Sequence, residues 1–241
     1  MSALAATVAG AIFVSAPVAA AVIDDFSCAQ VGGFQFVQDA AHGGPTIDTD
    51  TGLACAAGGT RTLELFDLTG TATAFAGAGV LSFDTLAGQT GKLRVTWSGL
   101  GGVDLTAGGG TQFEFQHVRD GDLSFELTLT DTFGGAGVLT YFADPFSPSD
   151  GITPVTDVIS YFDFSIIGSL SFTSIATISL VVNSFVPGVD SGLFYLQTNG
   201  TVPLEPPPSG LGVPLPASLA LSVFGLFGIA ATRRRAGNQL R

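Results

Sequence analysis

The residues of this 241-residue chain that could do chemistry are mostly aspartates. The segment IDTDTG places Asp48 and Asp50 two positions apart ahead of a glycine, and RDGDLS places Asp120 and Asp122 around Gly121. Calcium binds several oxygen ligands from a flexible loop, and an Asp-x-Asp pair before glycine can begin such a site. Neither segment has the full EF-hand spacing, and Asp-Gly is also a favourable turn. A calcium loop and a simple turn therefore stay open as alternatives, and no other cofactor is expected.

Catalytic groups are scarce. The sequence has two histidines and lacks the nucleophile-elbow, zinc-protease, P-loop and dinucleotide-binding motifs. His117 follows Phe113 and Phe115 in phase, which predicts a place at the end of a core face. Glycoside hydrolysis needs two carboxylates at a set separation, but Glu64 and Glu126 fall on the polar phase of predicted strands. We expect no enzymatic activity, and a secreted hydrolase is the least favoured function.

Cys28 and Cys55 are the only cysteines in the sequence. They lack the C-x-x-C spacing that supports a zinc site. If the chain is exported, it enters an oxidising compartment, where a lone pair of cysteines forms a disulfide. We predict this bond, and two free thiols or part of a metal site are the alternative.

Charge is distributed unevenly along the chain. The net charge is −12, yet 12% of residues are charged and 46% are hydrophobic, which is not the composition of a disordered chain. Four of the eight basic residues follow a C-terminal apolar run, and the four in the body are Arg61, Lys92, Arg94 and Arg119. An acidic body is repelled by phosphate backbones, which argues against nucleic-acid binding.

Alternating apolar and polar residues predict the elements that hold these side chains. The segments KLRVTW (92–97), LSFELTLT (123–130) and TLELFDL (62–68) have one apolar and one polar face, as half-buried strands do. Glycine-rich turns separate them from further candidates, which are QFEFQHV (112–118), GVLTYF (137–142), YFDFSII (161–167) and IATISLVV (175–182). Many short strands with such turns predict an all-β body over 22–200, an antiparallel β-sandwich or jelly roll.

The two ends of the sequence are apolar and read as helices. Residues 1–21 resemble a signal peptide, with an apolar stretch from Ala3 to Val14 and small residues at Ala19 and Ala21. Near the other end, a proline-rich linker over 201–212 precedes an uncharged run over 216–232, which as a helix would be ~25 Å long. That length is a short transmembrane span. The alternative for each segment is a buried helix.

A resemblance explains the C-terminal segment over 213–241. A proline motif, the apolar run and a basic stop follow one another there, and the residues of the motif and stop are Val213, Pro214, Leu215, Pro216, Ala217, Arg233, Arg234 and Arg235. This order resembles the VPLPA variant of the PEP-CTERM sorting signal. The resemblance implies export across the inner membrane of a Gram-negative bacterium, a transient membrane anchor, processing by an exosortase, and delivery to the cell surface or medium.

The sorting signal concerns delivery, so the function of the body needs its own hypotheses. The resemblance implies a Gram-negative host, and many bacteria with this family produce exopolysaccharide. This favours a structural or adhesive surface protein, for which that polymer is a candidate partner. The alternative is a carbohydrate-binding β-sandwich module, which an exposed aromatic platform would favour. The candidates are Trp97, Tyr141, Tyr161 and Tyr195, and Trp97 is in phase with core residues.

The sorting signal yields the first prediction. Replacing the arginines at 233–235 with serine should weaken membrane retention, because it removes the cytoplasmic charge that fixes orientation. Altering Pro214 and Pro216 should instead block processing and leave the protein in the inner membrane. Cell fractionation and mass spectrometry of the mature protein measure both effects. Mature surface protein that retains Arg241 would mean that the segment is a permanent anchor.

Overall fold

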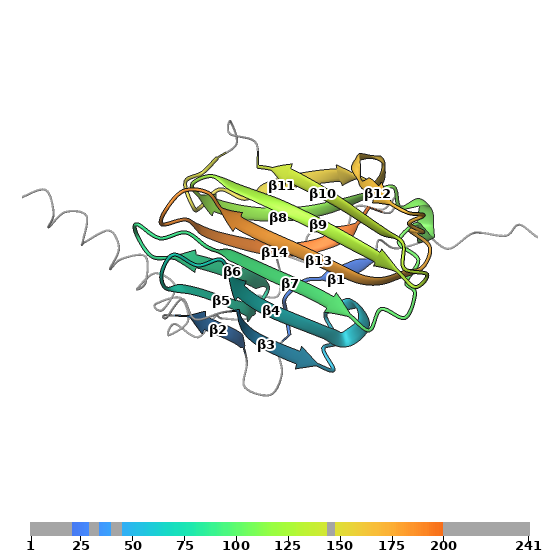
Figure 1. The fold of residues 1–241 in the computed structure, drawn as a ribbon, viewed down its shortest axis with the longest axis horizontal. Helices are drawn as coiled ribbons and strands as arrows, with labels where there is room; N and C mark the ends of the chain where they lie inside the picture. Colours follow the sequence, from blue (N-terminus) through green and yellow to red (C-terminus); the bar gives the residue numbers. More distant parts are fainter. Residues whose placement is uncertain (1–20, 29–33, 40–44, 144–147, 200–241) are drawn as a thin grey trace, which may run out of the picture. The chain divides into compact units, whose positions relative to one another are not determined.

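The computed structural model describes residues 21–28, 34–39, 45–143 and 148–199 (Figure 1). The predicted signal helix, linker and sorting segment lie outside these residues, except for Ala21. In the described part of the chain no helix has the length and apolar character needed to cross a bilayer. Its helical elements are the 3-10 turns η1 (Ala57–Gly59), η2 (Ala107–Gly109) and η3 (Tyr161–Asp163).

The strands form two antiparallel sheets that lie in two layers (Figure 1). Sheet A has the order β11-β8-β14-β6-β5-β2, with β1 also paired to β14. Its strands are β1 (Val22–Asp24), β2 (Gln35–Asp39), β5 (Ala72–Gly77), β6 (Val80–Thr85), β8 (Gln112–Asp120), β11 (Val155–Ser160) and β14 (Asp190–Thr198).

Sheet B has the order β12-β10-β9-β13-β7-β4-β3. Its strands are β3 (Thr46–Thr51), β4 (Thr60–Phe66), β7 (Lys92–Ser98), β9 (Leu123–Asp131), β10 (Ala136–Phe142), β12 (Ser165–Ile167) and β13 (Ile175–Ser184). The prediction of an all-β antiparallel sandwich is confirmed for the body. Six of the predicted segments correspond to strands β4, β7, β8, β9, β10 and β13.

Two local predictions are wrong. The segment 161–167 is not one strand: η3 begins it, because the Ser160 hydroxyl accepts a hydrogen bond from the Phe162 amide (3.2 Å), and only the last three residues pair as β12. The pair Asp48 and Asp50 does not lie in a loop. Both residues lie on β3, which pairs with β4 over its whole length.

The core lies between the sheets and is built from alternate residues of each strand. On β7, Leu93, Val95 and Trp97 are all fully buried, as their phase predicts. The same alternation brings His117 of β8 inward, where its Nε2 lies 2.8 Å from Oδ2 of Asp157. The predicted core position of this histidine is therefore confirmed, and it is part of a buried polar contact.

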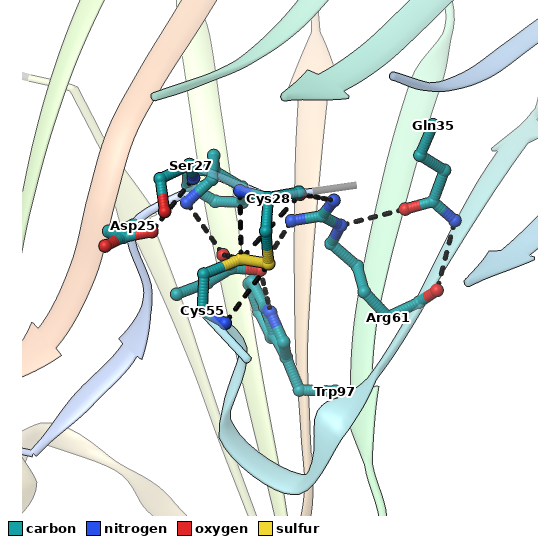
Figure 2. Close-up of a disulfide and its surroundings, with 9 residues drawn as sticks. Asp25, Ser27, Cys28, Gln35, Cys55, Arg61 and Trp97 are labelled. Carbon is teal, nitrogen blue, oxygen red and sulfur yellow. Dashed lines mark hydrogen bonds and ion pairs between the residues drawn. A yellow bond between two sulfur atoms is a disulfide. The ribbon is translucent and has the colours of Figure 1, made fainter. Parts of the chain in front are cut away.

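A buried arginine links both sheets at one end of the sandwich (Figure 2). Arg61 of β4 has no exposed surface, yet all its nitrogens donate: Nη1 to Oδ2 of Asp24 (2.9 Å), Nε to Oε1 of Gln35 (2.8 Å) and Nη2 to the carbonyl of Cys28 (3.0 Å). The Trp97 indole also donates to Oδ2 of Asp24 (2.7 Å). A buried ion pair is tolerated when hydrogen bonds satisfy both groups in this way.

The predicted disulfide is confirmed and lies beside this network (Figure 2). Cys28 and Cys55 are joined with their Cα atoms 5.7 Å apart, which ties the segment after β1 to the segment before η1. The bond closes a sequence separation of 27 residues. On the chain-entropy model such a loop stabilises the fold by about 3.5 kcal/mol.

Removing the Arg61 guanidinium should be strongly destabilising. Arg61→Met leaves the buried Asp24 carboxylate without its cation, so we expect the free energy of unfolding to fall by about 3–5 kcal/mol. Urea unfolding measures it. Arg94→Met, on the exposed face of the same sheet, is the control and should cost less than about 1 kcal/mol. The double variant Arg61→Met with Asp24→Asn should recover part of the loss, and a simple sum of the two single losses would contradict this account.

A second carboxylate organises the turn between β9 and β10. Asp131 accepts amide hydrogen bonds from Phe133 and Gly135 at Oδ1 and from Ser171 at Oδ2, each 2.8 Å long. The bond from Ser171, together with those from Gly135 and Phe133, lowers the pKa of this carboxyl below its ordinary value, although desolvation opposes the shift. The charged form thus holds the hairpin turn against the segment that precedes β13.

These hydrogen bonds to the Asp131 carboxylate predict that the stability of the fold is sensitive to acid. Because the pKa of Asp131 is lower in the folded chain, its carboxylate stabilises the fold above the ordinary pKa of about 4 and stops doing so as the pH falls below it. Asp131→Asn should therefore lower the urea midpoint most at pH 7. The difference from the natural chain should shrink progressively below about pH 4, and a difference that is constant with pH would contradict the role given to the charge.

Candidate functional site

The outer face of sheet B carries two neighbouring rows of side chains that cross five strands. Strand alternation turns these residues away from the core, and the register places them opposite one another on β4, β7, β13, β9 and β10. The first row consists of Phe66, Lys92, Asn183, Ser124 and Phe142. The second row consists of Glu64, Arg94, Val181, Glu126 and Thr140.

The two rows form a groove of about 340 Å³, which we call the sheet B groove. Every residue of the rows except Glu64 lines it, together with Phe185 just beyond β13. The hollow follows from side-chain size, since Ser124, Val181 and Asn183 in the centre are short and the first row ends in Phe66 and Phe142. A sheet face of this kind can hold an extended ligand against a polar floor.

Cations are held in place at the β4 end of the groove. Nη1 of Arg94 contacts Oε2 of Glu64 (2.5 Å), and the guanidinium carbon lies 4.4 Å from the centroid of the Phe66 ring. Nζ of Lys92 contacts Oδ2 of Asp67 (2.8 Å) and lies 5.6 Å from the same centroid. These exposed pairs add little stability, but they and the ring orient the donors of both side chains.

These two cations are unusual for this acidic protein. At most 1% of the surface of Arg61 and of Arg119 is exposed. Lys92 and Arg94 are therefore the exposed basic side chains of the described residues. Their side chains are 34% and 39% exposed. The exposed positive charge of the described chain therefore faces the sheet B groove.

An aromatic pair lies at the β10 end. Phe142 and Phe185 are 63% and 48% exposed, and their rings stack with centroids 5.8 Å apart and an interplanar angle of 17°. Single exposed apolar residues are common, but a stacked pair at the end of a groove is an apolar patch of the kind that marks a binding surface.

The acidic residues singled out in the sequence do not assemble into one site. Asp48 and Asp50 lie on the inward phase of β3, on the face of sheet B that is turned toward sheet A. Asp50 lies opposite Arg61 and is 6% exposed. Asp120 ends β8 in sheet A, and Asp122 follows in the turn, 3.5 Å from Nη1 of Arg119. The two pairs thus belong to different sheets.

The register gives Asp120 other acidic neighbours. It lies opposite Asp190 of β14, which lies opposite Asp84 of β6. In the described residues, the one group of three potential metal ligands within 4.8 Å is Asp24, Asp25 and Cys55. Cys55 is in the disulfide and Asp24 is paired with Arg61, so this group serves structure. Calcium binding at the predicted aspartates stays a prediction.

The four aromatic residues that the sequence offered for a platform do not gather on one exposed face. Trp97 and Tyr161 are buried and Tyr141 is half-buried, on the inward phase of β10. Tyr195 is on the outer face of sheet A, where its hydroxyl donates to Oε1 of Glu114 (2.7 Å); desolvation raises the pKa of this tyrosine to about 12.

The phenylalanines of the groove were not among the residues predicted from the sequence. A signal for one of them was present, because Phe66 is in phase with Glu64, on the polar face of its strand. For Phe142, adjacency to Tyr141 means that one of the two aromatic rings must point outward, since neighbouring residues of a strand face opposite ways.

Comparisons with known proteins add a likeness of fold. No protein-family model and no curated protein matches the chain. Among solved structures, the family 11 carbohydrate-binding module of cellulase Lic26A-Cel5E of Clostridium thermocellum is 13% identical, with a TM-score of 0.41, over 78% of this chain and 98% of that chain. The agarase AgWH50C is 10% identical, with a TM-score of 0.43, over 76% of this chain and 25% of that one. Likenesses this distant carry no argument about what this chain binds.

Proposed function

We propose that the body is a glycan-binding β-sandwich and that its binding site is the sheet B groove. The observation that carries the proposal is the pairing, in one groove, of a stacked exposed aromatic pair with oriented polar side chains. Phe142 and Phe185 supply the aromatic surface, and Arg94 and Lys92 supply donors that are already held by carboxylates. This geometry favours the carbohydrate-binding hypothesis over a purely structural body.

The chemistry of a sugar matches this arrangement. A sugar ring has an apolar C–H face, which packs against an aromatic ring, and a rim of hydroxyls, which both donate and accept hydrogen bonds. Arg94 and Lys92 can only donate, the Glu126 carboxylate accepts, and the Asn183 amide does both. The groove therefore offers partners for both halves of a hydroxyl's hydrogen bonding.

Delivery to the cell exterior forms part of the same proposal. The signal-peptide pattern over 1–21 and the PEP-CTERM-like segment over 213–241 support export and exosortase processing. Exopolysaccharide would then be a ligand within reach of the mature body, and adhesion to a glycan matrix would be its role at the surface.

Substitutions at either end of the sheet B groove should weaken glycan binding. We expect the disulfide-bonded body to bind members of a glycan array. Phe142→Ala or Arg94→Gln should weaken that binding at least about tenfold, because each removes a main contact of the proposed site. Phe36→Ala is the matched control: Phe36 is 54% exposed on β2, in the other sheet. Equal losses in Phe36→Ala and Phe142→Ala would argue against this site, and an array without any bound glycan would refute the proposed function.

A further inference from the structure

We infer that the sheet B groove binds an internal stretch of an uncharged, unbranched glycan that runs across the strands from Phe66 to the Phe142–Phe185 pair. This inference rests on the proposed function and specifies its ligand. Three features of the groove carry it: its direction and length, its open ends, and its balance of charge.

The direction follows from the register. Phe66, Lys92, Asn183, Ser124 and Phe142 lie opposite one another on five successive strands. Four steps between neighbouring strands amount to about 19 Å, whereas the two rows lie two residues apart along each strand, which is about 7 Å. The groove is thus several sugars long and longer than the spacing of its two rows, which fits an extended, linear chain that lies along the rows.

The ends of the groove are open. At one end, Phe142 and Phe185 have about half or more of their surface exposed, so a chain can continue over their rings. At the other end, the second row continues onto β3, where Ile47 lies opposite Glu64 and is 57% exposed. A site for a chain terminus has to enclose it, whereas this face lets a long polymer continue past both ends.

The charges of the groove favour a neutral ligand. Lys92 is paired with Asp67 and Arg94 with Glu64, two carboxylates beside the groove, and Glu126 in its lining is a third. Two cations against three carboxylates leave no net positive charge, on a chain whose net charge is −12. A uronate or sulfate group would be repelled and would have to displace a carboxylate from its partner, whereas a hydroxyl can bind beside both ion pairs.

Affinity electrophoresis of the body tests the charge and the polymer class. The gels contain neutral mixed-linked β-glucan, glucomannan, agarose or dextran, or acidic alginate, polygalacturonate or hyaluronate. We expect at least one neutral polymer to retard the body and no acidic one to do so, with retardation unchanged between about 0.05 and 0.5 M salt, because no net ionic attraction is screened. Retardation by an acidic polymer would overturn the inference while leaving glycan binding intact, and no retardation in any gel would refute both.

Calorimetry with oligosaccharides of the retarding polymer tests length and direction. We expect the hexasaccharide to bind at least about tenfold more tightly than the disaccharide, with no effect of reducing the terminal sugar. In Phe142→Ala that ratio should fall below about threefold, because the far aromatic contact is lost, and in Phe36→Ala it should be unchanged. A disaccharide that binds as tightly as the hexasaccharide, or binding that depends on an intact chain end, would show a small terminal pocket instead.

Discussion

The guanidinium of Arg61 is fully buried, so the surrounding protein must supply the hydrogen-bond acceptors and the countercharge that it would find in solvent. Asp24 supplies the countercharge, and Oε1 of Gln35 and the carbonyl of Cys28 each accept a further hydrogen bond. These groups come from β1, the segment after it and β2, so one buried cation holds the N-terminal part of sheet A against β4 of sheet B. An unpaired charge in this place would cost several kcal/mol, and the disulfide at Cys28 keeps one of its acceptors in position.

The inward direction of Arg61 also decides what β4 presents to solvent. Because side chains alternate along a strand, Arg61, Leu63 and Leu65 face the core, while Glu64 and Phe66 face outward beside Arg94 and Lys92. A slip of one residue in register would exchange the two faces. The network that satisfies Arg61 and the end of the groove that holds the exposed cations are therefore two consequences of one register.

The groove combines weak contacts that become useful together. The ion pairs of Lys92 and Arg94 add little to folding, and the exposed pair of Phe142 and Phe185 buries little surface in the described structure. Oriented donors and exposed rings that do little for folding are what a hydroxyl-rich ligand can use.

The sequence alone determined the strands with clear alternation, such as β7 and β9, the inward direction of Trp97 and His117, and the disulfide partner of Cys28, because these depend on local periodicity or on there being one other cysteine. It also supports the export and sorting segments, which lie outside the described residues. Only the tertiary structure decided that β4, β7, β13, β9 and β10 are neighbours, and with that order the site itself. Phe66 and Phe142 are far apart in the chain, and no local pattern encodes which strands pair, since that choice depends on long-range packing of the two sheets. The same packing turned Asp50 inward, opposite Arg61, where the sequence predicted a loop.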